Sequence, residues 1–176
     1  MDPSTVPPLP IKADLYAELA GQLEGITSGE PDEIANLANA AAILFHGLPD
    51  LNWVGFYLIQ GSELVLGPFQ GRPACIRIGL GAGVCGKAAA TRETQIVADV
   101  DAFPGHIACD AASRSELVVP LVDRGQLLGV LDLDSPRLAR FDAEDADGLE
   151  KFAAVLLRAL ESAEPPGVRR AGAEAT

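Results

Sequence analysis

One cysteine of this chain, Cys109, lies in a run from Phe103 to Asp110 that combines a turn, a histidine and an acid. Turns present side chains to solvent and ligands, and a histidine three positions before a thiol, here His106, can favour the thiolate. The other two cysteines, Cys75 and Cys85, also lie in short stretches punctuated by Gly and Pro. Three thiols beside turns indicate thiol chemistry, although free cysteines are frequently inert buried side chains.

Two carboxylates, Asp132 and Asp134, end a strand-like segment. Alternate residues of a strand share a face, so we expect both acids on one face, following Leu128 and Val130. That face is either solvent-exposed or turned toward a ligand cavity. In a cavity the acids could hold an ammonium group or donate a proton, because neighbouring buried carboxyls raise each other's pKa. Glu116, at the start of the partner strand, could be a third member of the cluster.

Other patterns are less specific. Three cysteines and His106 are zinc-ligand types, but no Cys-x₂₋₄-Cys spacing is present, which disfavours a zinc site. The glycine-rich run 79–83 lacks the spacing of a nucleotide loop and is better interpreted as a turn into a helix N-terminus, where backbone N–H groups could meet an anion. Trp53 and Tyr57 share one strand face, and such residues are more often core than ligand wall.

The composition limits the class of protein. The chain has 176 residues, of which 48% are hydrophobic and 22% charged, as expected for one globular domain. Its net charge of −12 disfavours binding to nucleic acid or to an anionic membrane. We find neither a secretory signal nor an apolar run of the roughly 20 residues that span a bilayer. Three cysteines, an odd number, argue against a secreted disulfide scaffold, so a cytoplasmic location is expected.

Periodicity and turn residues predict the elements that must position these groups. Helices are expected over about 14–25, 31–47 and 83–91, and from about 142 to the prolines at 165–166. Strands are expected over 53–59, 63–66, 94–98, 116–122 and 126–134, the first two and the last two as hairpins.

The predicted apolar faces are Leu15, Leu19 and Leu23 for the first helix, and Ile34, Leu37, Ala41 and Leu44 for the second. This order of elements predicts an α+β fold with a central antiparallel β-sheet and helices packed mainly on one face. We expect an extended N-terminal tail (1–11), one catalytic domain (12–163) and a flexible C-terminal tail (164–176).

Four segments carry a family resemblance, which runs from about Leu51 to Ser135. They are Gly67 to Cys75, Gly83 to Gly86, Phe103 to Asp110 and Ser113 to Pro120. In this order they closely resemble the free methionine-(R)-sulfoxide reductases, which are single-domain enzymes of the GAF fold. The resemblance implies reduction of free L-methionine-(R)-S-oxide to L-methionine, with no bound cofactor and with an external thiol reductant, thioredoxin.

The resemblance also implies a role for individual residues. Cys109 resembles the nucleophile, Cys75 the resolving cysteine and Cys85 a third, auxiliary catalytic cysteine. Glu116, Asp132 and Asp134 match acidic positions that line the substrate pocket. Trp53 matches an aromatic position that packs against the substrate's methyl group, and Tyr57 is included with it as a substrate-binding residue.

A GAF-like fold leaves a second function open, because fold alone does not determine function. The chain could be a non-catalytic small-molecule-binding module, or a thiol redox sensor in which Cys75 and Cys109 form a regulatory disulfide. Catalytic turnover with a reductant would separate the enzyme from both. A homodimer through the N-terminal helices is also possible.

Overall fold

The computed structural model describes residues 12–107 and 111–162, so both predicted tails lie outside the described residues. Its helices are α1 (Lys12–Thr27), α2 (Glu33–Gly47), α3 (Gly83–Thr91) and α4 (Ala143–Ser162). Its strands are β1 (Trp53–Gln60), β2 (Glu63–Gly71), β3 (Arg77–Gly79), β4 (Gln95–Val97), β5 (Ser115–Asp123) and β6 (Gln126–Ser135). A short 3-10 helix, η1 (Val100–Ala102), follows β4.

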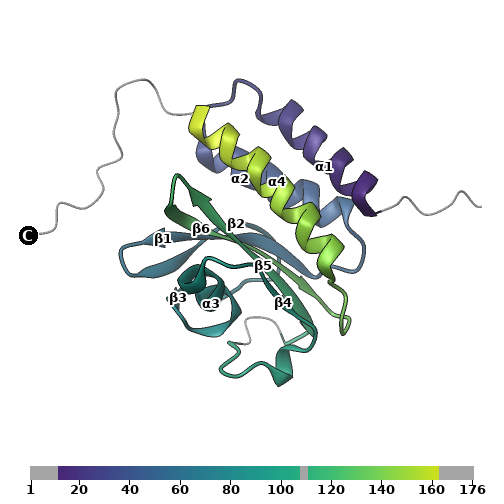
Figure 1. Ribbon diagram of the computed structural model, residues 1–176, viewed down its shortest axis with the longest axis vertical. Helices are drawn as coiled ribbons and strands as arrows, with labels where there is room; N and C mark the ends of the chain where they lie inside the picture. Colours follow the sequence, from purple (N-terminus) through teal and green to yellow (C-terminus); the bar gives the residue numbers. More distant parts are fainter. Residues whose placement is uncertain (1–11, 108–110, 163–176) are drawn as a thin grey trace, which may run out of the picture.

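The strands form one antiparallel sheet in the order β3-β2-β1-β6-β5-β4. The two predicted hairpins, β1–β2 and β5–β6, lie side by side because β1 pairs with β6. Helices α1, α2 and α4 cover one face of the sheet, and α3 lies on the other (Figure 1). The predicted α+β fold with helices mainly on one face is therefore confirmed.

The larger core lies between the sheet and the layer of three helices. Leu23 of α1, Leu37 of α2 and Phe152 of α4 are fully buried there against strand residues such as Leu131 and Leu133. Burial of each such side chain stabilises the fold by about 1.5–3 kcal/mol. This core anchors one face of the sheet to the helices, so a site can form on the opposite face, where a smaller core packs.

One predicted apolar face differs from the observed one, on α2. Leu37, Ala41 and Leu44 are buried as predicted, but Ile34 is 58% exposed. Asn36 is buried instead, and its Nδ2 donates a hydrogen bond to the Glu30 carbonyl oxygen at 2.9 Å. This bond ties the first turn of α2 to the preceding loop, which leaves Ile34 on the outer side.

Strand β6 changes face part-way along its length. The pairing of β5 with β6 shifts register between Leu121 and Val122, which marks a bulge. As a result Leu128 packs against the helix-side core, whereas Val130 belongs to the core on the opposite face. The prediction that Leu128 shares the face of Asp132 is therefore wrong, since the bulge resets the alternation.

The N-terminus of α4 is capped by Asp142. Its Oδ1 accepts hydrogen bonds from the backbone N–H groups of Glu144 (2.9 Å) and Asp145 (3.1 Å). We expect Asp142→Ala to lower the free energy of unfolding by about 1 kcal/mol, because these donors lose their partner. Urea unfolding measures the change. Asp142→Asn keeps a capping oxygen and serves as control, so equal losses in both variants would contradict the cap.

Candidate active site

A pocket opens on the sheet face that carries α3. It encloses about 380 Å³, part of which is open to solvent at the mouth. Its polar lining side chains are those of Tyr57, Cys85, His106, Ser113, Glu116, Asp132 and Asp134. No lysine or arginine is among the described lining residues, so the pocket attracts a cationic group such as an ammonium.

The glycine-rich run 79–83 forms a tight turn that leads into α3. Gly81 donates a backbone hydrogen bond to the Gly86 carbonyl oxygen at 2.8 Å, and Gly81 has a positive φ of 84°. A side chain at Gly86 would meet the Gly79 carbonyl oxygen at 2.3 Å, so only glycine allows this close packing. The turn therefore fixes the first turn of α3, and with it Cys85, over the sheet.

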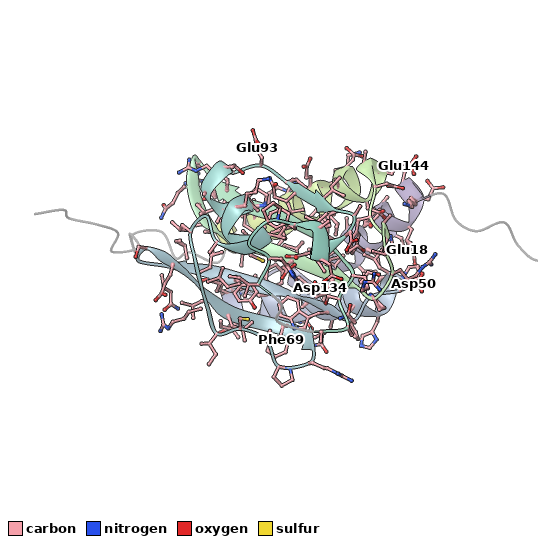
Figure 2. All side chains as sticks on the ribbon, turned by 90° about the horizontal axis from the view of Figure 1, so that it is seen from below. Glu18, Asp50, Phe69, Glu93, Asp134 and Glu144 are labelled. Atoms are coloured by element: carbon pink, nitrogen blue, oxygen red, sulfur yellow. The ribbon has the colours of Figure 1, made fainter. Side chains whose placement is uncertain are left out.

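Three carboxyl groups come together on the pocket floor. Antiparallel pairing sets Glu116 of β5 opposite Asp134 of β6, and Asp132 follows on the same face of β6. Glu116 and Asp132 are buried, with exposures of 6% and 5%, and Asp134 is half-buried. Figure 2 looks onto this face and shows Asp134 within the outline of the molecule, whereas Glu93 and Glu144 project from its edge.

Burial gives these carboxyl groups unusual proton affinities. It raises the pKa of Asp132 to about 7. It also raises the pKa of Glu116 well above its usual range, and the negative charges of Asp132 and Asp134 add to that effect. At least one proton therefore remains on the pair near neutral pH, which makes it a proton donor in a pocket that also carries negative charge.

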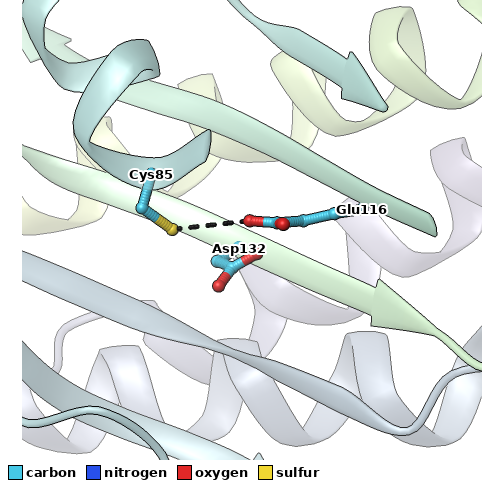
Figure 3. Close-up of side chains that lie close together, drawn as sticks. All are labelled: Cys85, Glu116 and Asp132. Carbon is cyan, nitrogen blue, oxygen red and sulfur yellow. Dashed lines mark hydrogen bonds between the residues drawn. The ribbon is translucent and has the colours of Figure 1, made fainter. Parts of the chain in front are cut away.

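Cys85 lies directly beside this pair. Its Sγ is 3.8 Å from Oε1 of Glu116 in a thiol–carboxyl hydrogen bond (Figure 3). The side chain is only 4% exposed, and burial raises the pKa of its thiol well above the usual value. Cys85 is therefore a neutral thiol at physiological pH, and an S–H donor rather than a thiolate.

His106 approaches the same carboxyl from the loop after η1. Its Nε2 is 3.7 Å from Oε2 of Glu116. Burial lowers the pKa of His106, so its imidazole is neutral at neutral pH. The contact is thus between a neutral histidine and a carboxyl group of raised pKa, not between two full charges.

Three stacked aromatic rings flank the pocket. Trp53 stacks on Phe69 and Tyr57, with ring centroids 5.4 and 5.9 Å away. Its Nε1 donates a hydrogen bond to the Arg72 carbonyl oxygen at 3.1 Å, and the Tyr57 hydroxyl donates one to the Cys75 carbonyl oxygen at 3.0 Å. Tyr57 lines the pocket, whereas Trp53 is not among the described lining residues. Together they anchor the segment that carries Cys75.

The three cysteines differ in their surroundings. Cys109 lies outside the described residues, although the chain on either side of it, at Ile107 and Ser113, lines the pocket. Cys75 is disulfide-bonded, whereas Cys85 is free and buried. Cys75, the predicted resolving cysteine, and Cys85, the predicted auxiliary cysteine, therefore differ in redox state.

Three side chains on the pocket floor lie close enough together to be considered as metal ligands. Among the described residues, one group has the spacing of metal ligands, namely Cys85, Glu116 and Asp132, whose ligand atoms lie within 4.8 Å of one another. Neither Cys75 nor His106 is part of this group, so it is a different set from the three cysteines and His106 considered as zinc ligands. The thiol and two carboxyls could hold a divalent cation only after losing the protons that their raised pKa values favour.

Several lining residues were not predicted, and Ile78 and Ser113 illustrate why. Ile78 comes from β3, which spans only Arg77–Gly79 and is too short for periodicity to reveal. It is buried between two exposed neighbours. Ser113 accepts a hydrogen bond from Nδ2 of Asn52 at 3.0 Å, which ties the pocket loop to the start of β1. Such a contact across the sequence leaves no local signal.

Comparison with known proteins agrees with this architecture. The sequence model of the GAF domain matches residues 29–161, so the class of the protein is that of GAF domains. A free methionine-R-sulfoxide reductase of Escherichia coli is 50% identical over 149 residues, covering 85% of this chain and 90% of that protein. One of Saccharomyces cerevisiae is 45% identical over 153 residues, covering 82% and 85%. The chain belongs to the free methionine-R-sulfoxide reductase family, a family of oxidoreductases.

A solved structure supports the same assignment. Free methionine-R-sulfoxide reductase from Neisseria meningitidis, in complex with its substrate, is 50% identical and superposes with a TM-score of 0.84. The match covers 88% of this chain and 93% of that one. Separately, none of the described helices combines the length and apolar character needed to cross a membrane.

Proposed function

We propose that this protein reduces free L-methionine-(R)-S-oxide to L-methionine, with Cys109 as the nucleophile. The observation that carries the proposal is the buried, proton-holding pair Glu116 and Asp132 on the floor of a pocket whose lining includes the chain on both sides of Cys109. A sulfoxide oxygen needs a proton as its bond to sulfur breaks, and the pair can supply it. The names of the family relatives point to the same substrate.

The proposed reaction transfers one oxygen atom. The Cys109 thiolate attacks the sulfoxide, the S–O bond of the substrate breaks, and the carboxyl pair supplies a proton. Methionine, reduced by two electrons, leaves, and Cys109 becomes a sulfenic acid. The Cys75 thiol then condenses with it, which forms the Cys75–Cys109 disulfide and releases water. A dithiol reductant, thioredoxin, restores both thiols by exchange.

The pocket accounts for a preference for the free amino acid. Its carboxylate charge suits the ammonium group of methionine sulfoxide, whereas the amide nitrogen of a peptide is neutral. The backbone at Ala82, Gly83 and Val84 lines the pocket at the start of α3, whose N-cap makes no side-chain hydrogen bond. Ala82 donates its own N–H to the Gly79 carbonyl oxygen. The first N–H groups of a helix have no partner within that helix, so those of Gly83 and Val84 suit the substrate carboxylate. Both recognition groups exist only on the free amino acid.

The decisive test is methionine release from the separated R and S epimers of free methionine sulfoxide, followed together with thioredoxin-dependent NADPH consumption. Turnover of the R epimer alone is expected. It should persist in EDTA, because we propose that the reaction needs no bound cofactor. Absence of turnover with a reduced, folded protein would favour the ligand-binding or redox-sensing module. The cytoplasmic location and the homodimer remain predictions.

Cys75 is the proposed resolving cysteine because it is disulfide-bonded while Cys85 is free. We expect Cys75→Ser to release about one methionine per enzyme and then stop, since no disulfide forms for thioredoxin to reduce. Rapid-quench measurement of the first turnover, alongside steady-state NADPH consumption, checks this. Normal cycling of the variant with thioredoxin would assign the resolving role elsewhere.

A further inference from the structure

We propose that Cys85 is a positioning residue whose S–H group orients the Glu116 carboxyl, and that it does not resolve the sulfenic acid. The inference rests on the proposed function. Cys85 lies in the first turn of α3 and is 4% exposed, and its Sγ is 3.8 Å from Oε1 of Glu116. The glycine turn that packs Gly86 on Gly79 fixes this contact.

A resolving cysteine must reach a sulfenic acid and afterwards present its disulfide to a reductant. Cys85 is poorly suited to both steps, because it is buried and because reactive cysteines are partly exposed thiolates. Burial, followed by the charges of Asp132 and Glu116, raises the pKa of its thiol. A neutral S–H group can nevertheless donate a hydrogen bond.

The contacts of the Glu116 carboxyl indicate how the S–H group of Cys85 orients it. Oε1 meets the Cys85 thiol, while Oε2 lies 3.7 Å from Nε2 of His106 at the pocket loop. With Oε1 held by the Cys85 thiol, Oε2 faces His106 in the loop after η1. Cys85 therefore fixes the rotation of the carboxyl that meets the substrate oxygen.

The groups that face this carboxyl come from every neighbouring element. They are Tyr57 from β1, Cys85 from α3, His106 from the loop, and Asp132 and Asp134 from β6. Burial, followed by the charges of the two aspartates, raises the pKa of Glu116, whereas the hydrogen bond from Cys85 lowers it. Removal of the thiol should therefore raise the pKa of the carboxyl pair further.

The experiment compares Cys85→Ala, Cys85→Ser and Leu127→Ala. Cys85→Ala is expected to slow the first turnover about tenfold at pH 7 and to move the basic limb of the kcat/KM profile upward by about half to one pH unit. Cys85→Ser keeps a donor and should restore most of both. Leu127→Ala trims a side chain that packs against the same site-side core but pairs with Val122 and does not line the pocket, so it should leave the profile unchanged.

Repeated turnover with thioredoxin distinguishes a positioning role of Cys85 from a resolving role. If Cys85 only positions Glu116, both Cys85 variants should run many thioredoxin-dependent turnovers per enzyme. A normal first turnover with an unshifted profile and no recycling would overturn the inference. If Cys85→Ala fails to fold, the same comparison with Cys85→Ser decides, since serine cannot form a disulfide. An inactive wild type would instead refute the proposed function itself.

A second readout does not depend on activity. In reduced, native protein, Cys85 should resist iodoacetamide until urea unfolds the chain, as followed by peptide mass spectrometry. Rapid native alkylation at Cys85 would overturn the buried, positioning role even if the enzyme were active.

Discussion

Cys109→Ser is expected to lower methionine formation by at least ~10³-fold and to abolish even the first turnover. A serine hydroxyl is essentially un-ionised at neutral pH and is a poor nucleophile toward sulfur, whereas a thiolate is both nucleophilic and able to carry the transferred oxygen. Rapid-quench detection of methionine from the R epimer measures the loss.

The control for this variant is Cys75→Ser, which makes the same chemical change at the proposed resolving position. It should retain the first turnover that Cys109→Ser loses. Both variants should still bind methionine sulfoxide by calorimetry, because neither change touches the carboxyl pair. Substantial methionine release by Cys109→Ser would refute the assignment of the nucleophile.

Glu116→Gln is expected to lower kcat/KM by about 10²–10³-fold, the range found when one group that stabilises a developing oxyanion is removed. A side-chain amide does not release a proton near neutral pH, so glutamine cannot protonate the sulfoxide oxygen as its bond to sulfur breaks. Glu63→Gln changes an exposed glutamate that pairs with Arg77 on the β2–β3 edge and should remain within about twofold of wild type. Equal kinetics in the two variants would remove Glu116 from the mechanism.

The same substitution should alter the pH dependence of stability. The pKa of Glu116 is raised in the folded state, so the folded protein holds a proton that the unfolded chain releases above its ordinary value near 4.5. Wild-type stability therefore falls as pH rises through this range, and Glu116→Gln lacks that loss. Urea unfolding should show the variant gaining stability relative to wild type between pH 5 and pH 8. A constant difference would contradict the raised pKa.

Much of the architecture could be predicted from local patterns. The helix at 83–91 and the hairpin of β5 and β6 were confirmed, because glycine turns and alternating apolar residues mark their limits. Alternation also grouped Asp132 with Asp134 on one face. Whether that face met solvent or a cavity could not be decided, because α3, which covers it, contacts the sheet across a long separation in sequence.

The other features that the sequence did not predict also depend on contacts outside the local pattern. A bulge that depends on pairing with β5 moved Leu128 to the other face. Cys75 and Cys85 are both near turns, so only their tertiary surroundings separate an oxidised cysteine from a buried one. The outward position of Ile34 depends on a hydrogen bond of Asn36 to a preceding loop, which periodicity does not register.

The two faces of the sheet also suggest a route for engineering. Most of the stabilising apolar burial is on the helix side, whereas the side chains proposed to act on substrate lie on the other. Changes in stability at distant sites are usually additive. Substitutions that improve packing among α1, α2 and α4 should therefore raise thermal tolerance and offset destabilising changes in the pocket, so that substrate preference can be redesigned without loss of the folded protein.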